Sequence, residues 1–475
     1  MWTNYWKKPA RRWTAPGPIS VLIKLKESDM SSPLENLAIV GTMPQSVDLI
    51  LPDINGIARG KRIPIAMLEK VLSNGISLPA SIFAADITGD TVEATGLVWE
   101  CGDADYPCFC LEHMLRPALW RRASAADLML TMQGPENAGF YGEPRALAKR
   151  LIADLAALGF FPQVAFELEF YLLPRPEETA QAAFPSNNGD IQVYGLDSID
   201  AHEQFFSELS AAAATYDLPL EAMVSENAHG QFEVNLHYRR DALRAADDAW
   251  ALKRLIKGVA GACGYTASFM AKPYPEEAGS GMHVHVSLVD REGHNAFTKQ
   301  PELLEQALGG MLVTMPEAVA LLAPHANSYR RFQVGSYAPT VACWGENNRT
   351  AALRIPRSEP EARRIEHRFA GADANPYLVL AAVLGGMLYG FQNRVSAPPA
   401  IAGNAYALHK GENVSQIVLP SRWDQALSAL SQGQCLAPLL GTPFVKLFSA
   451  VKQHEFNKLQ NTYHPLEYAW YFERS

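Results

Sequence analysis

The sequence predicts an α+β protein in which a small, mostly β domain precedes a larger domain built from helices and polar-faced strands. Three observations predict this class. The segment from about residue 36 to residue 135 has short extended runs with Gly-, Asp- and Pro-rich loops and no convincing long helix. Helical segments then alternate with strands whose two faces differ in polarity. The last third, from about residue 360, is mainly helical in pattern.

Length and composition limit the possible functions. The chain has 475 residues, enough for two or three domains with a large core. A net charge of −9 argues against nucleic acid or an anionic membrane as the main partner. Six cysteines without a CxxC pair favour a reducing, cytoplasmic environment. The longest apolar run, about 15 residues from Tyr377, is short for a bilayer span and indicates a buried helix.

The expected helices and strands can be assigned in order along the chain. Residues 1–35 are interpreted as a flexible extension without the apolar core of a signal peptide. Two extended runs flank the Asn-Gly pair of residues 55 and 56, which favours a β-hairpin. A helix is predicted over residues 142–159, where Glu and Pro open the pattern and Gly closes it. Further helices are predicted over 197–217 and 242–264, and strands over 161–173, 231–238 and 281–288.

The strand "GMHVHVSL", residues 281–288, separates its side chains by parity. Its even-numbered residues are apolar, whereas His283, His285 and Ser287 share the other face. For an isolated strand a solvent-facing edge is the simpler interpretation. Three further segments repeat the pattern, however, and together they predict the walls of a polar cavity. The polar residues on these segments are Glu167 and Glu169; Glu233, Asn235 and His237, with Glu226 shortly before; and Arg364, Glu366 and Arg368.

These residue types indicate a metal-dependent chemistry on anionic substrates. Glu167 and Glu169 repel each other on one strand face unless a cation lies beside them, and carboxylates suit Mg²⁺ or Mn²⁺. Four arginines, residues 330, 331, 349 and 354, offer planar cations for carboxylate or phosphate. Neither a P-loop nor a dinucleotide-binding glycine motif is present in the sequence.

The ordered blocks "FELEF", "ENAHGQFE", "GSGMHVHVSL", "NNRTAALRIP" and "RRIEHRFAGADANPYL" resemble the signature blocks of the class I glutamine synthetase superfamily, from about Asp53 to the C-terminus. The resemblance implies a β-grasp-like domain over residues 36–138 and a catalytic domain over 139–475, an antiparallel sheet funnel with helices. It also implies a hexameric ring or stacked dodecamer with active sites shared between subunits.

The resemblance also assigns roles to single residues. One metal ion would be held by Glu169, Glu226 and Glu233, and the other by Glu167, His283 and Glu366. Glutamate would be bound by Gly279, Arg331 and Arg368. ATP would be bound by Glu221, His285, Ser287, Arg349, Arg354 and Arg364. Asp53 would reach the ammonium site of a neighbouring subunit. The catalytic residues would be Asp53, Arg331, Arg349 and Tyr337, and the cofactors ATP and two or more Mg²⁺ or Mn²⁺ ions.

At two positions the sequence differs from the ammonia-using members of this family, and both differences concern the amine nucleophile. Tyr337 stands where a flap glutamate closes the ammonium site, and Ala278 stands where an asparagine precedes the glycines. The "GSYAPT" flap resembles the γ-glutamylpolyamine synthetase branch. We therefore expect ATP-dependent ligation of glutamate, through γ-glutamyl phosphate, to a primary amine larger than ammonia. This amine would be a polyamine such as putrescine, or an apolar or aromatic monoamine facing Tyr337 and Trp344; Glu346 could bind a second ammonium but is more simply a solvated loop residue.

Three alternatives remain open at the level of the sequence. The chain could be a true glutamine synthetase in which Asp53 serves ammonia, a non-catalytic structural or regulatory relative, or a ligase for a different acid. The intact set of six metal-ligand candidates argues against the non-catalytic reading. Tyr406 lies where some bacterial relatives are adenylylated, but its surroundings differ, so we predict no modification there. His229 and His237 are expected to be local polar residues.

Overall fold

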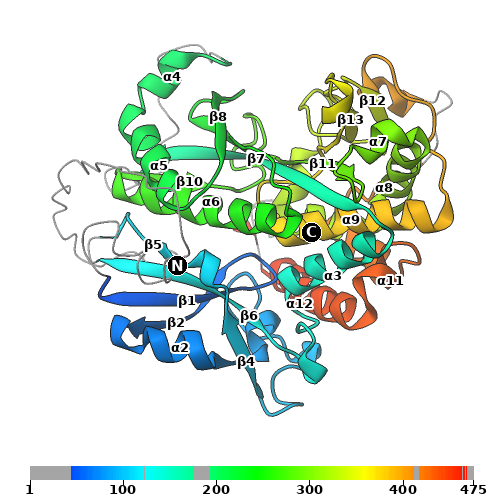
Figure 1. Cartoon of the computed structure of the whole chain (residues 1–475). Helices are drawn as coiled ribbons and strands as arrows, with labels where there is room; N and C mark the ends of the chain where they lie inside the picture. The colour runs from blue at the N-terminus through cyan, green and yellow to red at the C-terminus, as the bar shows by residue number, and fades with distance from the viewer. Residues whose placement is uncertain are drawn as a thin grey trace.

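The computed structural model of the chain describes residues 44–121, 124–175, 193–410, 417–462, 464, 465 and 467. The predicted extension over residues 1–35 lies outside them. The described residues form two sheets with helices between and around them (Figure 1). In that view the N-terminal sheet lies below the central helices and the second sheet lies above them.

The N-terminal sheet begins with the predicted hairpin. Its first two strands pair antiparallel, with Ser46 opposite Pro64 and Pro52 opposite Ala58, so the Asn-Gly turn lies between them as predicted. The sheet order is β2-β1-β6-β4-β3, and β5 also pairs with β6. The elements are β1 (Ser46–Pro52), β2 (Ala58–Pro64), α2 (Leu68–Asn74), β3 (Ile76–Pro79), β4 (Asp105–Cys110), β5 (Arg116–Pro117) and β6 (Ala125–Met132).

The second sheet carries the polar-faced strands. Its order is β12-β13-β14-β11-β7-β9-β8, and β10 pairs with β7. The 14-residue β7 lies at the centre, antiparallel to β9 and β11. The predicted strands over 161–173, 231–238 and 281–288 are therefore confirmed as neighbours in one sheet. The strands are β7 (Phe161–Pro174), β8 (Leu220–Ser225), β9 (Gln231–Leu236), β10 (Tyr265–Ser268), β11 (Met282–Val289), β12 (Trp344–Glu346), β13 (Leu353–Ile355) and β14 (Ile365–His367).

Helices cover the apolar backs of the strands. The helices are α3 (Pro144–Ala157), α4 (Leu196–Asp200), α5 (Glu203–Thr215), α6 (Ala242–Ala262), α7 (Ala296–Lys299), α8 (Pro301–Leu322), α9 (Pro376–Asn393), α10 (Trp423–Ser431), α11 (Ala437–Leu440) and α12 (Thr442–Gln460). The predicted helix over 197–217 is divided in two, because His202 has φ −119° and ψ 26°, outside the helical region. Among the described residues no helix is long and apolar enough to cross a membrane.

The apolar run from Tyr377 forms the buried helix α9, which packs against α8. Glycines allow this close approach: a Cβ atom on Gly310 of α8 would lie 2.2 Å from the main-chain oxygen of Gly386 on α9. Such a contact is impossible for any side chain. The two helices therefore form one apolar layer beneath the second sheet, and the prediction of a buried helix is confirmed.

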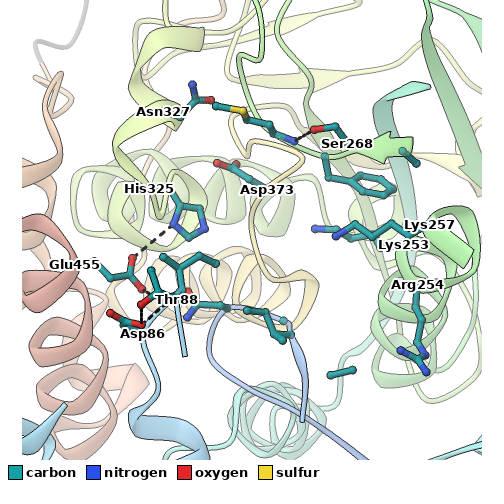
Figure 2. Close-up of a pocket in the computed structure, with 18 of the residues that line it drawn as sticks. Asp86, Thr88, Lys253, Arg254, Lys257, Ser268, His325, Asn327, Asp373 and Glu455 are labelled. Carbon is teal, nitrogen blue, oxygen red and sulfur yellow. Dashed lines mark hydrogen bonds and ion pairs between the residues drawn. The ribbon is translucent and has the colours of Figure 1, made fainter. Parts of the chain in front are cut away.

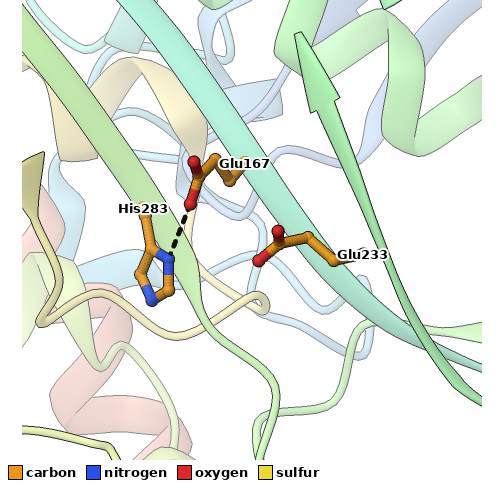
Figure 3. A group of neighbouring side chains, drawn as sticks. All are labelled: Glu167, Glu233 and His283. Carbon is orange, nitrogen blue, oxygen red and sulfur yellow. Dashed lines mark hydrogen bonds and ion pairs between the residues drawn. The ribbon is translucent and has the colours of Figure 1, made fainter. Parts of the chain in front are cut away.

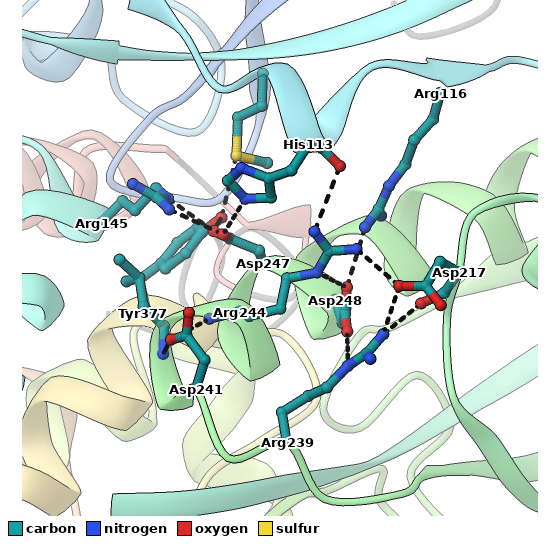
Figure 4. Close-up of polar contacts among 12 residues, drawn as sticks. His113, Arg116, Arg145, Asp217, Arg239, Asp241, Arg244, Asp247, Asp248 and Tyr377 are labelled. Carbon is teal, nitrogen blue, oxygen red and sulfur yellow. Dashed lines mark hydrogen bonds and ion pairs between the residues drawn. The ribbon is translucent and has the colours of Figure 1, made fainter. Parts of the chain in front are cut away.

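Buried ion pairs join two aspartates of α6 to β5 of the N-terminal sheet, to α3 and to the segment after β9 (Figure 4). Asp247 accepts two hydrogen bonds from Arg145, at 2.7 and 2.9 Å, and a third from the hydroxyl of Tyr377 at 2.8 Å. Asp248 next to it pairs with arginines from three segments, Arg116 at 3.1 Å, Arg239 at 2.8 Å and Arg244 at 3.0 Å. His113 also lies 3.7 Å from Asp247. Both carboxylates are buried, so neighbouring cations and hydrogen-bond donors have to balance their charges.

The α+β class is confirmed, and so are the hairpin and the mainly helical last third. The β-grasp-like character of the N-terminal sheet and the domain bounds at residues 36, 138 and 139 stay predictions.

Candidate active site

The candidate site lies on the polar face of the second sheet, where three strands meet. Strand register places Glu167 of β7 opposite His283 of β11, and Glu169 of β7 opposite Glu233 of β9. The apolar residues on the other face, among them Met282 and Val284, are fully buried. The alternation read from the sequence therefore separates core from site as predicted.

Glu167 is shared between the two histidines of β11. Its Oε2 lies 3.0 Å from Nδ1 of His283, and its Oε1 lies 2.8 Å from Nε2 of His285. Figure 3 shows Glu233 pointing toward this pair from β9. Ligand atoms of Glu167, Glu233 and His283 all lie within 4.8 Å of one another, and so do those of Glu167, His285 and Glu366.

The carboxylates of this cluster disturb one another electrostatically. Burial, followed by the charges of Glu167, Glu169 and Glu226, raises the pKa of Glu233 well above its usual value. Burial and then the charge of Glu169 raise the pKa of Glu226 to about 7. Burial opposes ionisation of Glu167 as well, but the two histidines hold its pKa well below normal. A cation between these groups would relieve the repulsion.

The donor set fits divalent metal ions. Carboxylate oxygens with an imidazole nitrogen, presented by rigid strands, suit Mg²⁺ or Mn²⁺. The structure groups the ligands differently from the assignment by resemblance. It brings His285 into the second group with Glu167 and Glu366, because residues two apart on β11 flank the same carboxylate. Glu169 and Glu226 lie beside the first group, where their negative charges raise the pKa of Glu233.

Glu366 connects the acidic cluster to two arginines. Arg354 of β13 lies opposite Glu366 of β14 and donates to it at 2.6 Å, and Arg368 donates to the other carboxylate oxygen. Burial opposes ionisation of Glu366, but His285 and Arg368 lower its pKa to about 2. The Nε atoms of Arg354 and Arg368 are buried without a hydrogen-bond partner among the described residues. Both arginines therefore retain donor capacity for an anionic ligand.

Arg331 is a buried cation without a carboxylate partner in the described part of the chain. Its Nη1 donates to the main-chain oxygen of Phe369 at 2.8 Å, and Nη2 lies 3.4 Å from that of Arg368. Burial lowers its pKa, but a guanidinium keeps its proton in proteins. Gly279 and Gly281 lie directly against its side chain, so the guanidinium packs on main-chain atoms that no side chain covers. This arrangement suits the carboxylate of a substrate.

A cavity of about 310 Å³ joins these parts, and both sequence departures line it. Its wall includes Glu169 and Glu226, Arg331, Ala278 and Tyr337. Tyr337 has φ 57°, a left-handed conformation that is unusual for a bulky residue and marks functional loops. The next residue of this flap accepts a hydrogen bond at 2.9 Å from the hydroxyl of Tyr406, which is buried.

The residues expected to bind ATP are only partly brought together. Arg364 donates to His285 at 3.1 Å, and Ser287 shares the face of His285 on β11. Arg349 is exposed, and its positive charge lowers the pKa of Glu226. Glu221 is instead the second residue of the edge strand β8, and its carboxylate lies 3.6 Å from the imidazole of His237.

Asp53 lies away from this cluster, in the turn after β1. Its carboxylate is buried and accepts hydrogen bonds from the main-chain nitrogens of Asn55 and Ile57 and from Arg59, at 2.8 to 2.9 Å. Asn375 at the start of α9 fixes the turn through two further hydrogen bonds, to the main-chain oxygens of residues 53 and 54. Within one chain, therefore, Asp53 does not line the 310 Å³ cavity.

A larger cavity of about 1120 Å³ lies beside this turn (Figure 2). Lys253 and Lys257 of α6 point into it, and His325 contacts Glu455 on the opposite side. Lys253 is held by the main-chain oxygens of Ala372 and Ala374 at 2.7 and 3.0 Å. None of the predicted metal ligands lines this cavity, so its size alone does not make it the site of the chemistry.

The structure also shows wall residues that sequence reasoning missed. Lys272, Glu276 and Glu277 line the smaller cavity from an irregular segment that has no periodicity to reveal them. Trp344 and Glu346, considered from the sequence as amine contacts, do not line it. The indole of Trp344 donates to the main-chain oxygen of residue 398 at 2.6 Å, and Glu346 is exposed on β12.

Comparison with known proteins places these features in a family. Residues 141–471 match the model "glutamine synthetase, catalytic domain". The chain is 40% identical over 437 residues to gamma-glutamylputrescine synthetase PuuA of Escherichia coli strain K12, covering 90% of this chain and 91% of that protein. It is 31% identical over 435 residues to glutamate–isopropylamine ligase of a Pseudomonas species, covering 89% and 93%. A solved structure of a GmaS/ADP complex superimposes with a TM-score of 0.78 at 25% identity, covering 90% of this chain and 97% of that one. The chain therefore belongs to the glutamine synthetase family.

Proposed function

We propose that the protein is an ATP-dependent ligase that joins the γ-carboxylate of glutamate to a primary amine larger than ammonia. The single observation that carries this proposal is the cavity whose wall combines Glu169, Glu226 and His283, at the edge of the metal-suited cluster, with the buried Arg331 and the neutral Tyr337. At the coarser level of a glutamate–amine ligase, the sequence-based prediction is confirmed by the names of the relatives.

The proposed reaction has two steps. The γ-carboxylate of glutamate attacks the terminal phosphorus of ATP, giving γ-glutamyl phosphate and ADP. A neutral amine then attacks the acyl carbon, phosphate leaves with the bonding electron pair, and the nitrogen gives up one proton. Divalent ions would be held by Glu167, Glu169, Glu226, Glu233, His283 and Glu366, with His285 beside them, and would neutralise charge on the phosphoryl group.

The protein side chains have separate proposed tasks. Arg331, with Gly279 against it, would hold a carboxylate of glutamate, and Arg368 would help through its free donor. Arg354 and Arg349 would bind the phosphates, with Arg364, His285 and Ser287 on the nucleotide side.

The preference for a larger amine is supported by the flap. Tyr337 brings a neutral phenol where a carboxylate would attract ammonium, and Ala278 leaves space beside it. The relatives named for putrescine and isopropylamine are consistent with this preference. We further propose that Asp53 acts in the site of a neighbouring subunit, since within its own chain it lies outside the cavity.

The assembly and cellular setting are proposals of the same kind. We propose a hexameric ring or stacked dodecamer in which a β-grasp-like domain, residues 36–138, meets the catalytic domain, residues 139–475, of the next subunit. A cytoplasmic location and a role in polyamine catabolism and nitrogen metabolism are consistent with the low cysteine content and the amine substrate.

An amine panel tests the proposed function. The full chain is supplied with ATP, glutamate and either Mg²⁺ or Mn²⁺, and phosphate release and amide formation are measured with ammonium and with several primary amines. We expect at least one organic amine to be a good substrate and ammonium a poor one. Saturable turnover with dilute ammonium, and none with any organic amine, would show a true glutamine synthetase instead.

A further inference from the structure

We infer that Glu276 and Glu277 form a subsite for a second, distal cationic group of the amine substrate. The enzyme would then select a diamine or polyamine over an apolar monoamine of the same length. This inference rests on the proposed function, because it names the substrate class for the same cavity.

Both glutamates line the 310 Å³ cavity, Glu276 as an exposed and Glu277 as a half-buried residue. Glu277 is two residues before Gly279, which lies against Arg331, so their Cα atoms are within about 7 Å of each other. The segment is anchored on both sides: the hydroxyl of Tyr171 donates to the main-chain oxygen of Ala278 at 2.6 Å, and the main-chain nitrogen of Lys272 donates to the side chain of Asn327 at 2.8 Å. The backbone that carries the two glutamates therefore has a defined place relative to the site.

Neither of these carboxylates has a direct protein partner among the described residues, although both act on Lys272 through space. The nearby cation, Lys272, is buried and donates through Nζ to the main-chain oxygen of Glu277 instead of to a carboxylate. Over the described ranges neither Glu276 nor Glu277 has an ion pair or a side-chain hydrogen bond. Burial lowers the pKa of Lys272 while both glutamates raise it, and Glu277 adds to the effect of burial in raising the pKa of Tyr171. Their negative potential therefore reaches the cavity wall.

A second observation indicates that this cavity receives an N–H donor. The side-chain amide of Gln231 donates to the main-chain oxygen of Gly279 at 3.0 Å and lies 3.2 Å from the hydroxyl of Ser280. Its Oε1 is buried in the same wall and, among the residues described, has no partner. A buried acceptor without a partner is costly in a native protein and is characteristic of a ligand site. This unpartnered acceptor favours a ligand that brings N–H groups to the cavity.

The flap offers an apolar surface for the methylene chain between the two nitrogens of a diamine. Val334 and Tyr337 line the cavity and are 71% and 55% exposed, so they present apolar surface without covering it. A methylene chain could contact them while one nitrogen faces the acidic cluster and the other faces Glu276 and Glu277. The methyl end of an apolar amine would instead displace water from two carboxylates without replacing their hydrogen bonds, which is unfavourable.

The test compares two amines that differ only in the distal group. They are 1,4-diaminobutane and n-pentylamine, in which a methyl group replaces the second ammonium. kcat and KM are measured with ATP and glutamate for the parent chain, for Glu276→Gln, for Glu277→Gln and for the double variant. Glu346→Gln is the matched control, because Glu346 is an exposed glutamate outside the cavity.

We expect the parent chain to favour the diamine, and the double variant to lower the ratio of kcat/KM for diamine to that for pentylamine by about tenfold or more, as for a lost charge-assisted hydrogen bond. The change should lie mainly in KM for the diamine, with KM for glutamate and the ratio in Glu346→Gln unchanged. An unchanged ratio in the double variant, with both amines still ligated, overturns the subsite and leaves the proposed function standing. Turnover of ammonium alone overturns the proposed function and the subsite with it.

Discussion

A Cβ atom on Gly281 would lie 2.6 Å from Nη2 of Arg331, so the two residues can lie this close only because residue 281 has no side chain. Gly281 also donates its main-chain N–H to Glu169 at 2.6 Å, which joins the cation and the acidic cluster through one peptide. The position of the buried guanidinium thus depends on a glycine that itself carries no chemistry.

Gly281→Ala is predicted to displace Arg331 and impair glutamate binding. Because a misplacement of about 1 Å can cost about 100-fold in rate, we expect KM for glutamate to rise at least tenfold, with a smaller change for ATP. Steady-state kinetics with each substrate varied separately measures this. Gly261→Ala is the control, since its Cβ would meet only the flexible end of Arg175 at 3.1 Å. Equal changes for glutamate and ATP would contradict the prediction.

Asp247→Asn is predicted to destabilise the fold strongly. The substitution leaves the guanidinium of Arg145 buried without its carboxylate, and breaking such a pair costs about 3 to 5 kcal/mol. Urea unfolding of both proteins measures the difference. Asp424→Asn breaks the exposed pair between Arg422 and Asp424 and should leave the unfolding midpoint almost unchanged. Similar effects of the two substitutions would show that the buried pair contributes no more to the free energy of unfolding than the exposed pair.

Glu143 is predicted to make the fold less stable as the pH rises. Burial raises its pKa from 4.5 to about 7, although Met132 and Thr131 donate hydrogen bonds to it. Between these two values the folded state binds a proton that the unfolded state has lost, so this contribution is present below pH 4.5 and is lost as the pH rises through 7. The loss is at most about 3 kcal/mol, at 1.36 kcal/mol for each pKa unit.

Glu143→Gln should remove that dependence. The amide keeps an acceptor for Met132 and cannot ionise, so the fall in unfolding temperature between pH 5 and pH 8 should be smaller in the variant than in the parent chain. Thermal unfolding at the two pH values measures this. A parallel fall in both proteins would mean that other groups carry the dependence.

Tyr337→Glu is predicted to change amine selection at the flap. A carboxylate at this position would attract a small cation and remove the phenol surface from the cavity. We expect the variant to impair the larger amine more than ammonium, as measured by kcat/KM for each in the same assay. The reverse order would contradict the assigned role of the flap. Tyr406→Phe serves as a comparison, because it loses the hydrogen bond that supports the flap without adding charge.

The sequence was sufficient for the site where side chains follow strand periodicity. His283 and His285 were predicted to face a polar cavity because their neighbours on β11 are apolar, and the structure places both beside Glu167. Glu276 and Glu277 could not be found in this way, because irregular backbone carries no period. The pairing of Arg145 with Asp247 was equally hidden, since 102 residues separate the partners and only the folded chain brings them together.

Glu233→Gln is predicted to stabilise the metal-free protein and to weaken its response to metal. Burial and the charges of Glu167, Glu169 and Glu226 raise the pKa of Glu233, so its ionised form costs stability at pH 8, and the neutral amide removes this cost while keeping an oxygen for Asn235. With a chelator present, the variant should therefore unfold at a higher temperature than the parent chain. Added Mn²⁺ stabilises a protein with a competent site by about 2.7 kcal/mol at 100 times the dissociation constant, and this gain should shrink in the variant because a charged ligand is gone. Glu292→Gln is the matched control: its exposed carboxylate belongs to a separate group with Asp290 and His294, and its loss should leave the Mn²⁺-induced shift intact. A full shift in Glu233→Gln, or a lost shift in Glu292→Gln, would move the metal site away from the strands β7, β9 and β11.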